Sequence, residues 1–235
     1  MEGPWIRQAS GCHRVGVDRF ACHRGDRAFA LALARAGAAV AVTARTASEL
    51  DETVTQIEQS GGRALAVPAD VTERQAVAAI VDTVTARFGP VDLLINNAGT
   101  VTPLGPLWKI DPDEWWRSME INLRSVLLCS SAVLLGMVAR QRGRIINIAS
   151  AAGKAATAHV AAYVTAKTAM VRLTENLAAE TKEHGTVRTS PCAPRGTSPV
   201  VGATRVEIET PVFDSGLSVY NIHYGWQAPT TIGRE

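Results

Sequence analysis

Short apolar runs alternate with amphipathic helical segments from Ala38 to about Gly185 of this 235-residue chain. Strand signals that alternate with helix signals are typical of βαβ units, in which consecutive strands lie parallel and helices pack on the sheet. The expected strands and helices are 39–44, 47–60, 63–67, 72–88, 91–95, 112–140, 144–150 and 161–177. The pattern predicts a single-domain α/β fold with a doubly wound parallel sheet between two layers of helices.

Capping signals mark where several of these helices begin. Thr46 to Glu49 and Thr72 to Gln75 match the capping box, in which a hydroxyl and a later acid or amide satisfy the first backbone amides. Asp111 precedes Pro112, a pair suited to the N-cap and the first helical position. The helix that they open is expected to run to about Arg140.

The charge and hydropathy of the chain argue against nucleic-acid and membrane partners. With 46% apolar residues the chain can bury a sizeable core, and a net charge of +2 without a basic run predicts no nucleic-acid footprint. The most apolar stretch, Val126 to Val138, is interrupted by polar residues and is shorter than a membrane span. Met1 to Asp18 lacks the apolar centre of a signal peptide. We therefore expect a soluble cytoplasmic protein.

The 4 cysteines show no disulfide-framework spacing, as expected in a reducing compartment. The dipeptide Cys-His occurs at 12–13 and again at 22–23, and these four side chains could ligate a metal. Adjacent Cys-His pairs lack the spacing of zinc fingers, so an irregular surface segment is the favoured interpretation and no metal site is predicted. Metal analysis of the purified chain would decide between the two.

Tyr163 and Lys167 are the leading candidates for chemistry. On a helix they lie on one face, one turn apart. The ordinary pKa of tyrosine, about 10, is too high for efficient proton exchange near neutrality, but a neighbouring ammonium favours the phenolate. The run from Arg144 to Ser150 predicts a buried strand that delivers Ser150 to the carboxyl edge of the sheet. Asn122 is a polar residue in an apolar helical pattern, and the partners of such a buried amide are expected to be catalytic.

The segment from Ala38 to Gly185 resembles the short-chain dehydrogenase/reductase family. The resemblance rests on four motifs in the family's order and spacing, namely Asn-Asn-Ala-Gly at 96–99, Asn122, Ser150 and the Tyr163/Lys167 pair. It implies the Rossmann-like fold of the family and reversible hydride transfer between a nicotinamide cofactor and a carbonyl or secondary alcohol.

The same resemblance implies a role for each catalytic residue. Tyr163 would act as the general acid/base for the substrate oxygen, and Lys167 would lower the pKa of Tyr163 and bond the nicotinamide ribose. Ser150 would hold the substrate oxygen, and Asn122 would anchor a water that relays protons to Lys167. His159 is expected to be a surface or substrate-pocket histidine rather than the base.

Arg45 favours NADP (NADPH) over NAD as the cofactor. An acid at the end of the second strand selects NAD through the ribose 2′-hydroxyl, but here Ala44 is followed by Arg45, whose guanidinium can pair with a 2′-phosphate. The alternative is that Arg45 is only a solvated residue after a strand. By resemblance the other cofactor contacts come from Asp70, Val71, Asn96, Ala98, Gly99, Tyr163 and Lys167. Asp70 also suits the positive end of the helix that follows it.

The expected partners are a small carbonyl or alcohol substrate and further copies of the same chain. By resemblance, the helices that end near Arg140 and Glu183 pair between subunits. A homodimer or homotetramer is therefore expected.

Both ends of the chain depart from the family pattern. Residues 1–27 lack an apolar strand run, and Ser10 to Val17 is only an echo of the glycine-rich phosphate turn, with valines in place of two glycines. The stretch 186–197 allows two alignments, one that equates Pro194 with the family proline and one that deletes a strand, and Pro191 argues against a central strand there. Residues 198–235 lack the family's final strand.

The chain is therefore divided into an atypical N-terminal segment 1–27, a dinucleotide-binding and catalytic core 28–185, and an atypical substrate-loop region 186–235. Two functions follow from this division. The first is an NADP-dependent oxidoreductase. The second is a catalytically silent member of the family, which keeps the fold as an interaction or oligomerisation module because its phosphate turn is broken. Reading-frame slips at both ends are a further hypothesis, which the coding DNA would decide.

Overall fold

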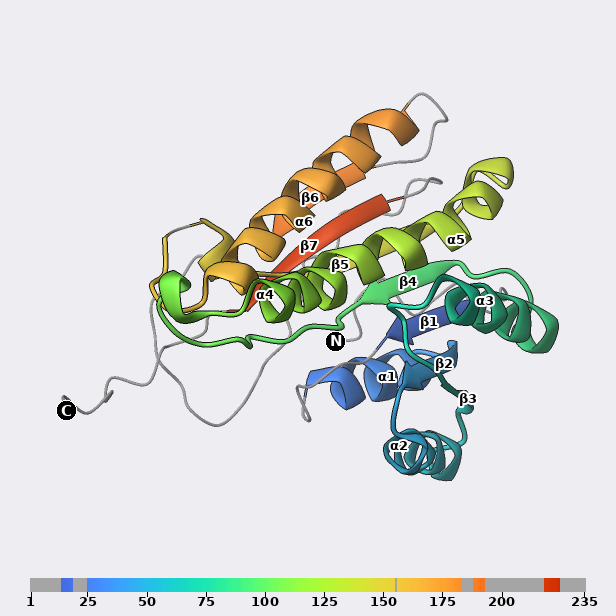
Figure 1. Cartoon of the computed structure of the whole chain (residues 1–235). Coiled ribbons are helices and arrows are strands. Elements are labelled where there is room, and N and C mark those ends of the chain that lie inside the picture. Colours follow the sequence, from blue (N-terminus) through green and yellow to red (C-terminus); the bar gives the residue numbers. More distant parts are fainter. Residues whose placement is uncertain (1–13, 19–24, 155, 183–187, 193–217, 225–235) are drawn as a thin grey trace, which may run out of the picture.

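Seven parallel strands form one sheet in the computed structural model, which describes residues 14–18, 25–154, 156–182, 188–192 and 218–224 (Figure 1). Their order across the sheet is β3-β2-β1-β4-β5-β7-β6. The strands are β1 Arg14–Asp18, β2 Ala39–Ala44, β3 Arg63–Pro68, β4 Leu93–Asn96, β5 Arg144–Ser150, β6 Arg188–Cys192 and β7 Ser218–Tyr224. Because β1 pairs with both β2 and β4, the strand order reverses there, and α/β sheets bind ligands at the carboxyl ends of such a switch point.

Helices cover both faces of the sheet, which confirms the doubly wound α/β prediction (Figure 1). One face carries α1 and α2, and the other carries α3, α5 and α6. The helices are α1 Gly25–Arg35, α2 Ala47–Gln59, α3 Arg74–Phe88, α4 Pro112–Met119, α5 Ser125–Ala139 and α6 Ala161–Thr181. Shorter turns are η1 Leu107–Lys109, the π-turn η2 Glu120–Arg124 and η3 Ala151–Lys154.

The central strands are buried on both sides because successive side chains of a strand point to opposite faces. Val40 and Val42 pack in the core cluster under α1 and α2, whereas Ala41 between them belongs to the cluster under α3 and α5. On β5, Ile146 likewise packs in the cluster under α1 and α2, and Ile145 in the cluster under α3 and α5. Strands buried on both faces are near-continuous apolar runs, which is why the sequence revealed them clearly.

Of the three predicted helix caps, one is confirmed, one is confirmed in position but lacks its side-chain bond, and one is wrong. Oδ1 of Asp111 accepts a hydrogen bond of 2.7 Å from the backbone amide of Asp113 and so caps α4. Thr46 is the N-cap of α2, but its side chain makes no cap hydrogen bond within the described residues. The N-cap of α3 is Glu73 instead of Thr72. The hydroxyl of Thr72 donates to the carboxylate of Asp70 at 2.7 Å.

The predicted long helix is the continuous run of α4, η2 and α5, which spans Pro112–Ala139. By length and composition this run could cross a membrane, since its most apolar 18-residue window has a mean hydropathy of 1.8. However, 44% of that window is buried inside the molecule, where Val133 and Met137 pack in the core. A core helix has the same composition, so the run is weak evidence for a membrane.

Strands near both ends of the chain correct two predictions. β1 lies within residues 1–27, where the sequence predicted no strand, and Val15 and Val17 pair with β2 instead of forming a turn. β7 lies within residues 198–235, which were expected to lack a final strand, and its Ser-Val-Tyr-Asn-Ile-His-Tyr run contains the β-branched and aromatic residues that strands favour. β6 contains Pro191 and lies at the sheet edge, where proline is tolerated.

Some predictions fall on residues that the structure does not describe. These include the Cys-His pairs at 12–13 and 22–23, together with residues 10–13 of the expected phosphate turn. Among the described residues, no group of three or more His, Cys, Asp or Glu side chains could hold a metal ion. The three-part division of the chain stays a prediction.

Candidate active site

Lys167 on α6 is buried, with 4% of its surface exposed. Its Nζ donates a hydrogen bond of 2.8 Å to the carbonyl oxygen of Ile148 on β5. Burial lowers the pKa of Lys167 from 10.5 to about 8, because low-polarity surroundings disfavour the charged form of an amine. A group with this pKa can exchange protons at mildly alkaline pH.

Tyr163 lies one helical turn before Lys167 and is half-buried. Nζ of Lys167 is 5.8 Å from the centroid of the Tyr163 ring, within the range of a cation–π contact. The two side chains therefore meet on one face of α6, as their spacing of four residues predicts.

Asn122 is fully buried in the π-turn η2. Its Oδ1 accepts a hydrogen bond of 3.1 Å from the backbone amide of Thr100, and its Nδ2 donates to the Thr100 carbonyl at 2.8 Å. Nδ2 also donates to the carbonyl of Ser118 at 2.9 Å and to its hydroxyl at 3.2 Å. The amide thus finds the partners that burial demands in the loop after β4 and in α4. A π-turn inside a helix is frequent at functional sites.

Gly99 brings the loop after β4 against both Asn122 and Lys167. A Cβ at this position would lie 2.9 Å from Oδ1 of Asn122 and 3.6 Å from Nζ of Lys167. The first distance is well below the optimal separation of non-bonded heavy atoms, so only a hydrogen fits there. Gly99 is therefore needed for the approach of these side chains, a reason different from the predicted approach of a cofactor.

Ser150 is the last residue of β5, as the sequence predicted, and is 1% exposed. Its Oγ accepts a hydrogen bond of 3.2 Å from the backbone amide of Ala152. Ser150 follows Ile148, the partner of Lys167, by two residues. The strand that holds Lys167 therefore also ends in Ser150.

Asn96 occupies an interior position at the end of β4. Its Nδ2 donates to Oδ1 of Asn147 at 2.8 Å and to Oγ of Ser130 at 3.1 Å, which ties β4 to β5 and α5. Its buried Oδ1 has no hydrogen-bond partner in the described part of the chain. The amide has a structural role in these contacts, and its predicted contact with the cofactor stays a prediction.

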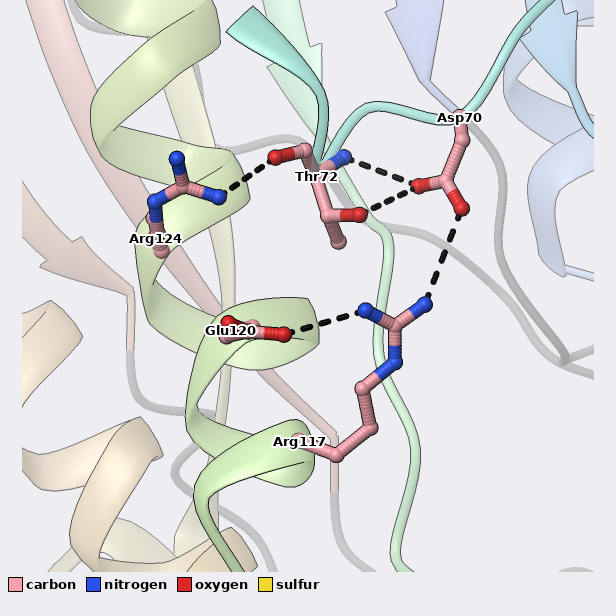
Figure 2. A network of polar contacts seen from close by, with 5 residues as sticks. All are labelled: Asp70, Thr72, Arg117, Glu120 and Arg124. Carbon is pink, nitrogen blue, oxygen red and sulfur yellow. Dashed lines mark hydrogen bonds and ion pairs between the residues drawn. The ribbon is translucent and has the colours of Figure 1, made fainter. Parts of the chain in front are cut away.

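A second polar group lies where β2 and β3 end (Figure 2). Oδ1 of Asp70 accepts from the amide of Thr72 at 2.9 Å and from its hydroxyl at 2.7 Å, and Oδ2 lies 3.8 Å from Nη2 of Arg117. Partial burial by itself raises the pKa of Asp70, but the hydrogen bonds from Thr72 and the charges of Arg117 and Arg45 lower it below its ordinary value. The exposed Arg45 therefore lies close enough to act on Asp70.

The loops after β2, β3 and β4 adjoin one another at this edge. The backbone amide of Ala69 donates to the carbonyl of Ala44 at 2.9 Å. Val71 and Ala98 are each 1% exposed and belong to one core cluster. Their side chains are buried, so the predicted cofactor contacts at these two positions would have to use backbone groups.

The predicted residues form two groups along the carboxyl edge of the sheet. The first consists of Gly99, Asn122, Tyr163 and Lys167, with Ser150 at the end of the adjacent strand. The second consists of Arg45, Asp70 and Val71.

Several residues of this region escaped the sequence prediction. Asn147 carries the same signal as Asn122, an amide in an apolar run, and could have been found. Thr100 and Ser118 carry no signal, because much of their contact with Asn122 uses backbone groups.

An apolar surface hollow of about 380 Å³ is lined by Leu107, Ile110, Pro112, Trp115 and Trp116. Trp115 and Trp116 have ring centroids 5.3 Å apart, whereas Trp108 is 84% exposed. The loop that leads to the hollow is tied to the segment before α6, since the amide of Gly105 donates to the carbonyl of His159 at 2.9 Å. Trp115 and Trp116 therefore line a surface hollow.

Comparisons with known proteins bear on the identity of the chain. The family model described as short chain dehydrogenase matches residues 26–209. A short chain dehydrogenase of Pseudocercospora fijiensis is 38% identical over 161 residues, which cover 68% of this chain and 52% of that protein. Cis-4-hydroxycyclohexanecarboxylate dehydrogenase of Sinomonas cyclohexanicum is 36% identical over 181 residues, which cover 77% of this chain and 72% of that protein. The chain thus spans about half the length of the first relative and more of the second.

Solved structures agree with this assignment. An NAD⁺-bound xylitol dehydrogenase has a TM-score of 0.72 and 31% identity, over 76% of this chain and 68% of that chain. A metagenomic short-chain oxidoreductase in complex with NADP has a TM-score of 0.71 and 34% identity, over 78% of this chain and 83% of that chain. Since the family model matches well over half of the sequence and solved relatives superpose on most of the described fold, the chain belongs to the short chain dehydrogenase family of oxidoreductases.

Proposed function

We propose that the protein transfers a hydride reversibly between NADP(H) and a small carbonyl or secondary alcohol, with Tyr163 as the general acid/base. The observation that carries this proposal is the buried Lys167, whose Nζ lies 5.8 Å from the Tyr163 ring and is held by the Ile148 carbonyl. A buried cation is costly and is retained where it serves a purpose. Here its purpose is to favour the phenolate of the adjacent tyrosine.

Each polar residue of the first group has a task in this reaction. Tyr163 donates its proton to the alkoxide that develops during reduction and takes it back during oxidation. Ser150 holds the substrate oxygen at the end of β5. Asn122 anchors a water that passes protons to Lys167.

The donor set of the site suits a nicotinamide dinucleotide, which supplies or accepts the hydride when bound. An ammonium has three hydrogens, and among the described residues Lys167 donates one hydrogen bond to Ile148, which leaves donors for a ribose hydroxyl. At the other end Arg45 suits a 2′-phosphate, and Asp70 with the Val71 amide suits an adenine edge. Arg45, whose charge acts on Asp70, is the reason for proposing NADP over NAD. One of the solved relatives binds NADP and another binds NAD⁺.

Self-association and a cytoplasmic location are parts of the same proposal. Leu127 and Leu135 on α5 are 47% and 80% exposed, and a spacing of eight residues places them on one side of the helix. Exposed leucines on the helix beside the catalytic strand suit pairing into a homodimer or homotetramer.

The proposal is tested by assaying carbonyl reduction with NADPH and with NADH over a panel of small aldehydes and ketones. The purified chain should turn over at least one of them and should prefer NADPH. Tyr163→Phe should lower kcat by about 100- to 10,000-fold, because general acid catalysis contributes that much.

His159→Asn is the matched control, since His159 is the nearby rival base and has a positive φ of 67°, which asparagine tolerates. This variant should keep its turnover. Undiminished reduction by the Tyr163→Phe protein would refute the assignment. Absence of saturable NADPH binding to the parent chain would instead favour a catalytically silent member of the family.

A further inference from the structure

The π-turn that carries Asn122 is tied at both ends to the loop after β3 (Figure 2). At its last residue, Nη1 of Arg124 donates a hydrogen bond of 2.6 Å to the carbonyl oxygen of Thr72. At its first residue, Glu120 accepts a bond of 3.0 Å from Nη1 of Arg117, whose Nη2 lies 3.8 Å from Asp70. These contacts span about fifty residues of sequence.

The loop at 70–72 is held in place by its own hydrogen bonds and by burial. Asp70 accepts two hydrogen bonds from Thr72, and the side chains of Val71 and Thr72 are each 1% exposed. A loop that is closed on itself and packed in the core can hold another segment in place without itself reordering.

The π-turn needs contacts from outside the helix to stabilise it, because its geometry is unfavourable by itself. One residue more than an α-turn is inserted, and removal of that insertion would rotate α4 relative to α5 by about 100°. Asn122 would then leave Thr100 and Gly99. Both flanking helices are fixed by buried residues, among them Ser118 in α4 and Val126 in α5. A mismatch between the packing of the two helices would therefore change the backbone of the π-turn between them.

The two arginines contribute unequally. The Arg117 contacts are exposed ion pairs, with 49% of its side chain accessible, and exposed pairs are weak and screened by salt. Arg124 is also an exposed residue, but its bond is short, is made by a charged donor and ends on the carbonyl of the buried Thr72, which places it among the stronger hydrogen bonds.

We propose that Arg124 is a positioning residue, which holds the π-turn against the loop after β3 and so fixes Asn122 beside Lys167, with Arg117 supporting the other end of the turn. This rests on the proposed function, in which Asn122 takes part in proton transfer. Neither arginine was expected from the sequence to serve the site.

The first test does not depend on activity. The backbone amide of Thr100 donates to Oδ1 of Asn122, so its hydrogen-exchange rate, measured by NMR on the whole protein, reports the position of Asn122. Arg124→Ala should raise that rate by about tenfold or more through local opening. Arg124→Lys, which keeps a charged donor, and Arg117→Gln should have smaller effects.

Arg172→Ala is the matched control, since Arg172 lies in an i,i+3 ion pair with Glu175 on α6 and its side chain is 75% exposed. It should leave the exchange of Thr100 unchanged. An Arg124→Ala protein that is folded and keeps the parent rate at Thr100 would overturn the proposal.

The second test uses the proposed reaction. Arg124→Ala should lower kcat by about tenfold or more and change the kcat–pH profile, because a displacement of about 1 Å in a catalytic arrangement has costs of that order. KM for NADPH should change less than kcat. A rise in KM with kcat and its pH profile preserved would mean that Arg124 serves only the adenosine side, and the positioning role would be rejected.

The two proposals fail separately. If the parent chain reduces no carbonyl, or if Tyr163→Phe reduces it equally well, the proposed function falls while the exchange of Thr100 still decides whether Arg124 positions Asn122.

Discussion

Gly99 is a position at which one added carbon should disturb the site. A Cβ there would meet Oδ1 of Asn122 at 2.9 Å, and Asn122 cannot yield easily because it is held by Thr100 and Ser118. We expect Gly99→Ala to cost about 1–3 kcal/mol of stability, and to lower kcat by up to about 100-fold if Asn122 moves by about 1 Å. Urea unfolding and carbonyl reduction would measure the two effects. Gly136→Ala is the control, since its Cβ would lie 3.2 Å from Nη1 of Arg140, a side chain held to the Val91 carbonyl that must shift only slightly, and since alanine is favoured within a helix by about 0.5–1 kcal/mol. Equal behaviour of the two variants would contradict this account.

The starts of α2 and α4 offer a paired test of what a cap contributes to a helix. Asp111 accepts a hydrogen bond from the amide of Asp113, whereas the side chain of Thr46, although suited to the N-cap by its type, makes no cap bond in the described structure. Asp111→Ala should therefore destabilise the protein by about 1 kcal/mol, and Thr46→Ala should stay within about 0.5 kcal/mol. The midpoints of urea unfolding at constant m-value would show the difference. If Thr46→Ala proved the more costly change, the cap assignment from the structure would be wrong.

The stability of the complete fold should depend on pH through Lys167. Below pH 8 the folded protein keeps this buried amine charged, at a cost that the unfolded chain does not have. Between pH 8 and about 10.5 the folded form releases the proton while the unfolded form retains it, so the unfolded state binds more protons and stability rises with pH. Relative to Lys167→Met, the free energy of unfolding of the parent should gain about 3 kcal/mol across this window. Urea titrations of both proteins at several pH values would measure this gain, and parallel pH curves would show that Lys167 titrates normally.

Much of the fold was predictable because it is written in local patterns. Apolar runs and caps identified the strands from 39 to 150 and their helices, and the spacing of Tyr163 and Lys167 placed them on one helical face. β1 and β7 were missed, since β1 contains only two apolar side chains, Val15 and Val17, and β7 stands among proline- and glycine-rich residues that obscure its pattern. β7 also inserts between β5 and β6, an order that no local pattern contains.

The sequence by itself determined the α/β layers and which side chains are candidates for the reaction, because periodicity and motif spacing act between neighbours along the chain. Only the tertiary structure decided how those side chains are held. The bond from Arg124 to Thr72 joins residues 52 apart, and that from Asn96 to Asn147 joins residues 51 apart. Likewise, the pKa of Lys167 follows from burial between α6 and β5. Such contacts and burial arise when separate elements pack, and packing is a property of the folded chain.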